Sequence, residues 1–170
     1  MRKPKRTPNR KRSSSLDTPD FRSAWVPFAK QHFLPEFDAL NLEFWIDELE
    51  DVRAPARAVA KKIAETYDHY AKIVESVFQS DMSLIAMREA GTFSDEEMAR
   101  HSRLLSRLMR TYRSYQRVEL ENLPERYLLF IKESWNEWPA LKQEMLGLLS
   151  RMRDAWDREH HSPHDDHYIG

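Results

Sequence analysis

Apolar side chains recur at steps of three and four over most of the chain, and this is the period of an amphipathic α-helix. The longest stripe begins after Pro55 and runs to about residue 80, with Val59, Ile63, Tyr67, Tyr70, Val74, Val77 and Phe78 as its members. Another stripe follows Pro139 and contains Leu141, Met145, Leu148, Leu149, Met152 and Trp156. Proline is well tolerated in the first turn of a helix, where no intrahelical bond needs its missing N–H. We therefore predict that one helix begins at Pro55 and that the last helix begins at Pro139.

Shorter helices are predicted before the longest stripe. Thr18 followed by Pro19 is typical of an N-cap and a first helical residue, and Pro27 and Pro35 limit the length of this first helix. The segment is aromatic and is expected to pack onto the body through Phe21, Trp25, Phe28, Phe33, Leu34 and Phe37. A second helix is predicted over residues 36–51, where apolar and acidic side chains alternate.

The sharpest local signal is a capping box formed by Ser94 and Glu97. In this motif each side chain bonds to the free backbone N–H of the other residue, and an apolar pair, here Phe93 and Met98, closes over the turn. The stripe that follows contains Leu105, Leu108, Met109, Tyr112 and Tyr115. A long helix is therefore predicted to begin directly after Ser94.

About six or seven helices result from these signals. Asp81 and Gly91 bracket a short helix, and Pro124 begins another. The apolar residues of the short helix are Leu84, Ile85 and Met87. Only three glycines occur in 170 residues, whereas sheet-rich folds use many glycines in tight turns. We predict an all-α antiparallel bundle over residues 18–158, because each amphipathic helix must bury its stripe against the others.

Charge divides the chain into a basic arm and an acidic body. The formal net charge is only −1, yet the first twelve residues carry seven cations and no acid: Arg2, Lys3, Lys5, Arg6, Arg10, Lys11 and Arg12. Residues 1–17 lack an apolar cluster, so we expect them to be a disordered arm. Seven cations can neutralise phosphates of a nucleic acid or meet an anionic membrane surface, and they can also serve as a nuclear-import signal. A solubilising tail without a specific partner is the alternative.

The sequence lacks the residues that several classes of chemistry require. There is no cysteine, so thiolate catalysis and zinc-finger sites are excluded. The glycines are isolated, so a phosphate-cradling loop is not expected, and no G-x-S-x-G motif occurs. The longest apolar run, residues 127–131, is too short to cross a bilayer, and no secretory signal follows the basic start. We expect a soluble intracellular protein, cytoplasmic, or nuclear if its source is eukaryotic or viral.

Helical spacing suggests one set of candidate metal ligands, although we expect neither a metal nor another cofactor. The candidates are Glu65 with His69 and Glu97 with His101. Each pair is four residues apart, whereas di-metal bundles space Glu and His by three. Near the C-terminus, a polar tail over residues 159–170 contains His160, His161, His164, Asp165, Asp166 and His167, which could chelate a divalent ion or stay solvated.

These observations favour a non-enzymatic helical module that binds a protein partner, with the basic arm adding affinity for anionic groups. The alternative is a nucleic-acid-associated protein that binds phosphates through residues 1–12. A cluster of acids at Asp47, Glu48, Glu50 and Asp51 could bind a basic partner or the protein's own arm, or form a solvated helix face. The oligomeric state is left open.

Two resemblances to known families add expectations. Residues 76–138 resemble part of an uncharacterised family of bacterial helical proteins, whose frequent N-terminal membrane helix has no counterpart here. The residues that carry this resemblance are Ser80-Asp81, Leu84, Gly91, Ser94-Asp95-Glu96-Glu97, Tyr112, Tyr115 and Leu123-Pro124-Glu125. That family implies a helical fold and no particular activity.

Residues 37–70 are similar to the regulator-of-G-protein-signalling domain, which is also all-helical. The matching residues are Phe37, Asn41-Leu42-Glu43-Phe44-Trp45, Ala60, Ile63, Tyr67 and Tyr70, and residues 112–116 and 127–134 could match later helices. The resemblance implies that Asn41 would contact the switch region of a G protein. The usual Phe-Asp-x-Ala-Gln of that domain does not occur in this chain.

Overall fold

The structure of the protein is a computed structural model that describes residues 20–79 and 84–157. Within these ranges the chain forms α-helices and one short 3-10 turn without any β-strand, so the predicted all-α class is confirmed. The elements are α1 (Phe21–His32), α2 (Phe37–Phe44), η1 (Ile46–Glu48), α3 (Pro55–Ser76), α4 (Leu84–Ala90), α5 (Asp95–Glu121) and α6 (Pro124–Asp157). The predictions for the basic arm, the caps at Thr18 and Asp81, and the histidine-rich tail fall outside the described residues.

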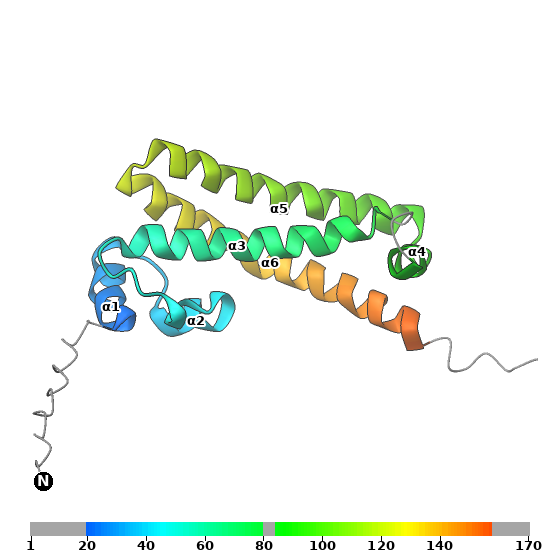
Figure 1. Ribbon diagram of the computed structural model, residues 1–170, viewed down its shortest axis with the longest axis horizontal. Coiled ribbons are helices and arrows are strands. Elements are labelled where there is room, and N and C mark those ends of the chain that lie inside the picture. Colours follow the sequence, from blue (N-terminus) through cyan, green and yellow to red (C-terminus); the bar gives the residue numbers. More distant parts are fainter. Residues whose placement is uncertain (1–19, 80–83, 158–170) are drawn as a thin grey trace, which may run out of the picture.

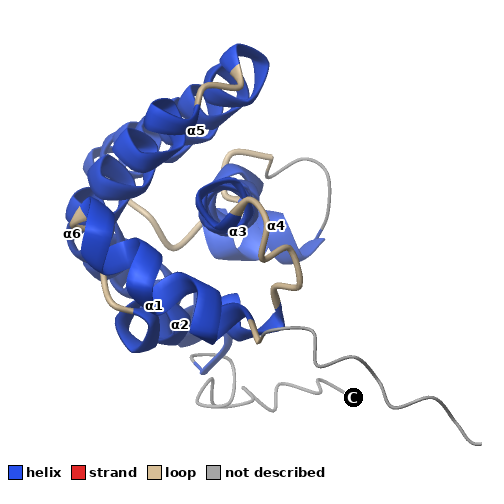
Figure 2. Ribbon diagram, turned by 90° about the vertical axis from the view of Figure 1, so that its left-hand side faces the viewer, coloured by secondary structure: helices blue, strands red, loops and turns tan. Residues whose placement is uncertain are grey.

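Three long helices, α3, α5 and α6, form the body of the bundle (Figure 1). The chain runs forward along α3, back along α5 and forward again along α6, so neighbours in sequence are antiparallel. Helices α1 and α2 pack at the N-terminal end of α3, and α4 contacts α6 at the opposite end. In the end-on view, α5, α6, α1 and α2 form an arc with α3 on its inner side (Figure 2). Helix α3 is therefore the element around which the others pack.

The sequence of α3 explains its central position. Its predicted stripe is buried at Val59, Ile63, Tyr67 and Val74, whereas Tyr70 is only partly buried. Small residues share the buried surface and let the neighbouring helices approach closely: Ala56, Ala60, Ala64 and Ala71. The Tyr67 hydroxyl, buried with its ring, donates a 2.9 Å hydrogen bond to the backbone carbonyl of Ser134 in α6. This bond satisfies the polar end of an otherwise apolar contact.

The first helix is longer than the prolines predict. It begins at Phe21 with Asp20 as its N-cap, whose carboxylate accepts a 3.2 Å bond from the Arg22 amide. It also continues through Pro27, although a proline inside a helix removes one backbone bond. Burial on the inner face offsets that loss, and the buried residues are Phe21, Trp25 and Ala29.

The second helix is shorter than predicted, because α2 ends at Phe44 rather than near residue 51. Phe44 and Ile46 are both fully buried, yet two positions in an α-helix point about 200° apart. A continuous helix could not bury both, and the left-handed backbone of Trp45 turns the chain so that both side chains reach the core. The Asn41 side-chain oxygen accepts a 2.8 Å bond from the Asp47 amide and fixes this turn.

The last two predicted helices are one helix, because α6 passes through Pro139 without ending. Its buried positions keep steps of four and three on both sides of this proline: Tyr127, Ile131, Ser134, Trp138, Leu141, Met145, Leu148 and Met152. The stripe does not change phase at Pro139, so a continuing helix buries both halves, and this burial offsets the disruption that a proline inside a helix causes. No helix in the described ranges has the length and apolar composition that a membrane span requires.

Candidate functional site

The four candidate metal ligands predicted from the sequence are Glu65, His69, Glu97 and His101. An ion pair of 3.7 Å joins Arg57 near the start of α3 to Glu119 near the end of α5, as expected for antiparallel neighbours. In this register the pair on α3 lies near the middle of its helix, and the pair on α5 lies in the first two turns, close to the opposite end. Among the residues the structure describes, no group of three or more acidic or histidine side chains is placed to hold a metal ion.

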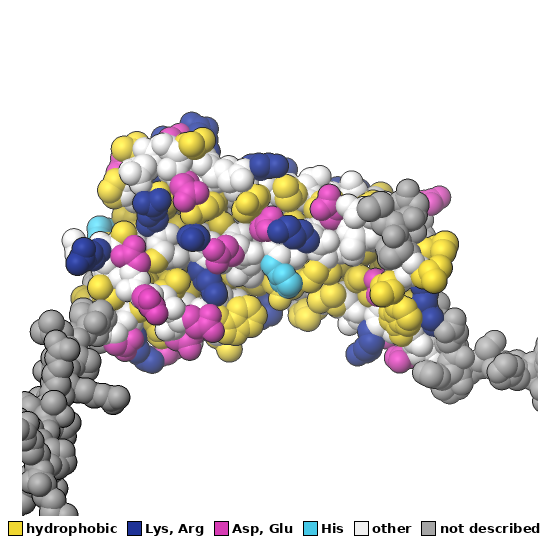
Figure 3. Space-filling model, in the orientation of Figure 1, with side chains coloured by type: hydrophobic (Ala, Val, Ile, Leu, Met, Phe, Trp, Pro, Cys, Tyr) yellow, Lys and Arg dark blue, Asp and Glu magenta, His cyan; other side chains and the backbone are white. Residues whose placement is uncertain are grey.

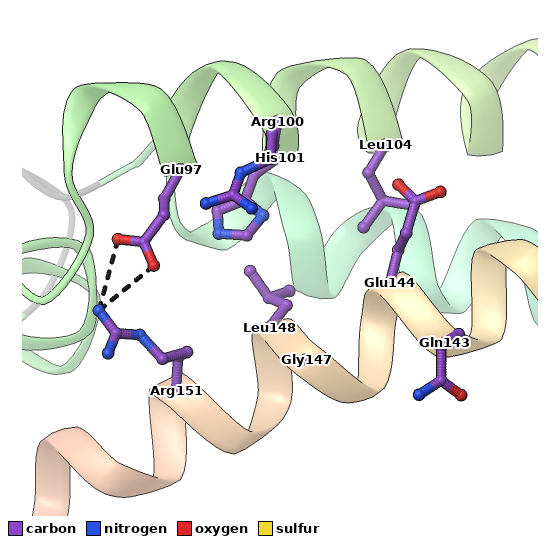
Figure 4. A pocket seen from close by; sticks show the side chains of 9 residues that line it. All are labelled: Glu97, Arg100, His101, Leu104, Gln143, Glu144, Gly147, Leu148 and Arg151. Carbon is purple, nitrogen blue, oxygen red and sulfur yellow. Dashed lines mark hydrogen bonds and ion pairs between the residues drawn. The ribbon is translucent and has the colours of Figure 1, made fainter.

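The predicted pair on α5 lines a pocket of ≈ 310 Å³ between α5 and α6. The lining residues are Glu97, Arg100, His101, Leu104, Gln143, Glu144, Gly147, Leu148 and Arg151 (Figure 4). Side chains from the start of α5 and from the C-terminal half of α6 project toward one another across it, and Arg151 reaches back to Glu97. None of the lining residues carries a hydroxyl or a thiol, so the pocket offers no such nucleophile.

Glu97 serves the architecture of this pocket. Its carboxylate accepts a 2.9 Å bond from the Ser94 amide, and its own amide donates to the Ser94 hydroxyl at 3.3 Å, so the predicted capping box is confirmed. Arg151 forms an ion pair with the same carboxylate at 3.3 Å. The backbone hydrogen bond from Ser94 is the main cause that lowers the pKa of Glu97, and the charge of Arg151 adds to it. The Glu97 carboxylate therefore interacts with the start of α5 through Ser94 and with α6 through Arg151.

His101 lies against the capping turn, with its ring 4.7 Å from that of Phe93 in an edge contact. Its Nε2 atom is buried and has no hydrogen-bond partner among the described residues. Desolvation by burial lowers the pKa of His101 against the opposing charge of Glu97, and Arg100 lowers it further. His101 is therefore neutral at pH 7 and, without a partnered acid or nucleophile beside it, does not complete a catalytic set.

The described aromatic side chains with the largest exposed fractions, Phe33 and Trp45, lie elsewhere, directly after α1 and α2. Val26 and Lys30 lie about one turn apart on α1, Asp38 and Leu42 lie about one turn apart on α2, and Phe33 and Trp45 directly follow the two helices. Between the two helices lies a hollow of ≈ 550 Å³, lined among others by Val26, Lys30, Phe33 and Asp38. We use the name α1–α2 groove for this hollow together with Leu42 and Trp45, two exposed residues further along the chain of α2 that do not line the hollow itself.

The apolar residues of the α1–α2 groove are open to solvent. The exposed fractions are 88% for Phe33, 76% for Leu42, 55% for Trp45 and 52% for Val26. Exposed leucines are common singly, but four exposed apolar side chains on two helices that pack together, or directly after them, make a candidate interaction site. The aromatic segment packs onto the body through Phe21, Trp25 and Phe37, whereas Phe33 is open to solvent.

Backbone geometry makes two of these residues unusual. Phe33 and Trp45 are the C-caps of α1 and α2, and both have left-handed backbone with φ of 53° and 49°. Glycine and asparagine are the usual residues there, because a Cβ atom makes this conformation costly by about 1–2 kcal/mol. Asn122, the C-cap of α5, follows the usual preference at a φ of 49°. Both aromatic caps therefore have a strained backbone. Because their rings are largely exposed, burial of the rings compensates for little of this strain.

Acidic side chains surround α2. Residues 31–52 contain seven acids and no lysine or arginine. Three acids form ion pairs, Asp38 with Arg22 at 2.8 Å, Glu43 with Lys142 at 2.7 Å and Glu48 with Lys62 at 3.6 Å. No ion pair within the described ranges involves the other acids, Glu36, Asp47, Glu50 and Asp51. Figure 3 shows acidic side chains gathered beside apolar ones over α1 and α2.

The seven cations predicted to bind phosphate lie outside the described residues, so the structure places none of them. Asn41, which the signalling-domain resemblance assigns to a partner contact, already accepts the Asp47 amide bond within the chain. No protein-family model, no curated protein and no solved structure matches this chain. The two resemblances therefore stay predictions that rest only on the residues that carry them.

Proposed function

We propose that this protein is a non-enzymatic interaction module and that the α1–α2 groove is its docking surface for a protein partner. The observation that supports the proposal is the pair of exposed aromatic C-caps, Phe33 and Trp45, with φ of 53° and 49°. A bulky side chain at such a position costs stability, and exposure of its ring to water returns nothing. A partner that covers both rings would supply the missing apolar burial.

The residue types in the groove also suit a binding site. Tryptophan and other large aromatic side chains contribute much of the affinity at protein interfaces, because they bury a large area with few rotatable bonds. Trp45 and Phe33 supply that area, while Val26 and Leu42 extend it along the two helices. The α5–α6 pocket is a weaker candidate, because its carboxylates are already held by Arg107 and Arg151.

The basic arm has a separate role in this proposal. Its seven cations add electrostatic affinity for anionic groups, on the partner or on a nucleic acid bound nearby. If the arm binds nucleic acid by itself, full-length protein is retained on immobilised duplex at low salt, and replacing all seven cations by glutamine abolishes that retention. A loss of helical circular dichroism in the same variant would show that the arm is part of the fold instead.

A comparison of three tagged proteins tests the docking surface. They are the wild type, the double variant Phe33→Asn/Trp45→Ala, and Leu84→Ala, which removes a leucine that is 81% exposed on α4 at the other end of the molecule. We expect a partner from the native lysate that binds the wild type and Leu84→Ala but not the double variant. Circular dichroism checks that all three are folded.

The proposal fails if all three proteins recover the same set of proteins, because binding would then not depend on the groove. It also fails if the wild type turns over a substrate and the double variant retains that activity while neither binds a partner.

A further inference from the structure

We propose that a row of arginines along the outer side of α5 binds the phosphate backbone of double-stranded DNA. We call this row the α5 arginine face, and its residues are Arg100, Arg103, Arg107, Arg110, Arg113 and Arg117. The face belongs to a different helix from those of the α1–α2 groove. The inference therefore goes beyond the function proposed above and does not depend on it.

Arginine and serine make up nearly all of the solvent-exposed residues in the middle of α5. Residues 98–118 contain six arginines and neither an acidic residue nor a lysine. Apart from Ala99, the exposed residues of this range are all of these two types: Arg100, Ser102, Arg103, Ser106, Arg110, Arg113, Ser114 and Arg117. A guanidinium group can donate two parallel bonds to one phosphate, and serine hydroxyls also bond phosphate oxygens. The composition of the face is therefore that of a phosphate-binding surface.

The arginines follow one side of the helix. They recur at steps of three and four from Arg100 to Arg117, so the row is about 26 Å long. Arg103, Arg110 and Arg117 are seven residues apart and lie on nearly the same line, two turns from one another. Each arginine of the row has another arginine three or four residues away, and like charges at that spacing repel. A polyanion bound along the row would remove this repulsion.

Only part of this positive charge is balanced by ion pairs. Arg107 is held by Glu137 at 3.1 Å and also by Glu144, both of which lie in α6. Arg117 is held by Glu121 at 2.7 Å. No ion pair between described residues involves the other four arginines of the face.

Acidic side chains border both ends of the row. Arg100 lines the α5–α6 pocket together with Glu97, and Arg117 lines a hollow together with Glu133 of α6. Three arginines in the middle of the row line neither of these hollows and form no ion pair within the described ranges: Arg103, Arg110 and Arg113. The last of them donates a 2.7 Å bond to the amide oxygen of Gln116, which is neutral. The unbalanced charge therefore lies in the middle of the row.

The position of α5 leaves this face accessible to a large ligand. In the end-on view α5 forms one end of the arc, and α2, which acidic residues surround, forms the other end (Figure 2). Figure 1 likewise shows α5 and α2 on opposite sides of α3. The basic face is thus separated from the most acidic part of the described chain. The major groove of B-DNA is about 12 Å wide and admits an α-helix, so a single helix at the edge of the bundle can approach its phosphates.

Other anionic partners fit this face less well. Protein interfaces gain most of their affinity from buried aromatic and apolar side chains, and the exposed residues of 99–117 include no apolar side chain larger than Ala99. An interfacial membrane helix also needs apolar residues that enter the lipid. Single-stranded nucleic acid stacks on exposed aromatic rings, but Tyr112 is half-buried and Tyr115 is buried. The narrow major groove of A-form RNA would not admit the helix.

Binding of full-length protein to a labelled DNA duplex, measured by fluorescence anisotropy in about 0.1 M salt, tests the inference. The α5 variant is Arg103→Gln/Arg110→Gln/Arg113→Gln. The charge-matched control is Lys30→Gln/Arg53→Gln/Arg153→Gln, which removes three exposed cations outside α5. A third protein carries lysine instead of glutamine at the three α5 positions, because lysine keeps the charge. Circular dichroism checks that all proteins are folded.

We expect the α5 variant to bind the duplex about tenfold or more weakly than the wild type, whereas the control and the lysine variant keep most of the affinity. Each lost phosphate contact should lower the slope of log affinity against log salt by about 0.9, so three lost contacts should lower it by about 2.7. Two duplexes of unrelated sequence should bind alike, because phosphate contacts carry no sequence information.

A variant of the basic arm separates the contribution of α5 from that of residues 1–12. This variant replaces the seven cations of the arm by glutamine. If α5 binds DNA, the arm variant still binds the duplex at low salt, and adding the three glutamine substitutions in α5 removes that binding. An arm that binds by itself predicts instead that the arm variant does not bind at all.

The inference is overturned if the wild type does not bind duplex DNA at low salt, or if the α5 variant keeps the affinity and the salt slope of the wild type. An equal loss in the control, or no binding by the arm variant, also overturns it. Tighter binding to vesicles of anionic lipid than to DNA, dependent on the same three arginines, would assign the face to a membrane instead. The lysate comparison tests Phe33 and Trp45, so the proposed function is decided separately.

Discussion

The Glu43 carboxylate accepts a 2.7 Å hydrogen bond from the indole Nε1 of Trp138, which joins α2 to α6 across 95 residues of sequence. Lys142, one turn further along α6, donates to the same carboxylate at 2.7 Å and 2.8 Å. The Trp138 ring contacts Phe44, at 5.0 Å between ring centroids, and Tyr67, at 5.4 Å. The carboxylate thus fixes the position of the ring around which α2, α3 and α6 pack.

Glu43→Ala should lower the free energy of unfolding by about 2–3 kcal/mol, because the buried indole N–H and Lys142 would both lose a charged partner. Glu43→Gln should cost less, about 1 kcal/mol, since the amide oxygen can still accept from Trp138. Urea unfolding followed by circular dichroism measures both values. Asp38→Ala is the control: its ion pair with Arg22 is exposed on both sides, so its loss should cost no more than about 0.5 kcal/mol. Equal losses for Glu43→Ala and Asp38→Ala would refute the structural role of Glu43.

The same carboxylate predicts acid sensitivity. Burial acts to raise the pKa of Glu43, but the hydrogen bonds from Lys142 and Trp138 outweigh it and lower the pKa below its ordinary value of 4.5. The unfolded chain therefore takes up the proton first as pH falls, so stability is lost from about pH 4.5 down to the folded pKa. Glu43→Gln should flatten this part of the stability profile, measured by urea unfolding at a series of acidic pH values. An unchanged profile in the variant would contradict the assignment.

Phe33→Asn should raise the stability of the protein by about 0.5–1 kcal/mol, because asparagine adopts the left-handed conformation more readily than phenylalanine does. The ring of Phe33 is 88% exposed, so little burial is lost. Phe33→Ala is the matched control: it also removes the ring but keeps a Cβ atom without the local hydrogen bonding of asparagine, and it should not stabilise. Thermal unfolding distinguishes the two. If neither or both variants gain stability, strain at this cap is not the cause.

Gly147→Ala should also stabilise the protein, by about 0.5–1 kcal/mol, because Gly147 lies inside α6 and alanine favours the helical backbone. A Cβ atom added there would meet nothing within 4 Å. Gly91→Ala is the comparison, since Gly91 follows α4 rather than lying inside a helix and its Cβ would lie 3.4 Å from the Met87 carbonyl. A lower urea midpoint for Gly147→Ala would contradict the open space beside this residue.

The sequence predicted the parts of the fold that short-range chemistry decides. The capping box at Ser94 and Glu97 was predictable because two residues and their own backbone contain the whole motif. The helix start predicted at Pro139 is wrong, because the preference of proline for a first turn is local, whereas the burial of the stripe from Tyr127 to Met152 extends through this residue in one phase.

The candidate docking surface could not be predicted in the same way. Phenylalanine and tryptophan are residue types that usually lie in the core. The exposure of Phe33 and Trp45 depends on where α1 and α2 end relative to the body. The end of α2 is fixed by the burial of Ile46, which is a tertiary contact. The acidic residues after Trp45 were visible as a cluster, but their relation to an apolar groove required the packing of α1 against α2.

His101 provides the last prediction, a loss of stability in mild acid. Its pKa is lowered below 6.5 in the folded protein, mainly because burial disfavours the charged imidazolium. Well above pH 6.5 the ring is neutral in both states and contributes no pH dependence. As pH falls from 6.5 to the folded pKa, the unfolded chain binds the proton more readily, so the free energy of unfolding decreases. Below the folded pKa both states are protonated, and the loss levels off.

His101→Phe should remove this dependence while keeping the edge contact with Phe93, and urea unfolding from about pH 5 to about pH 8 measures it. Arg100→Gln provides a graded test, because Arg100 lowers the pKa of His101 less than burial does, so this variant should only shrink the effect. Direct titration of the His101 ring by proton NMR should give a pKa below 6.5 in the wild type and a higher value in Arg100→Gln. The wild type and His101→Phe could instead show identical slopes of stability against pH in this window. That result would mean that the Nε2 atom is solvated in the folded protein, and that burial does not lower the pKa of His101.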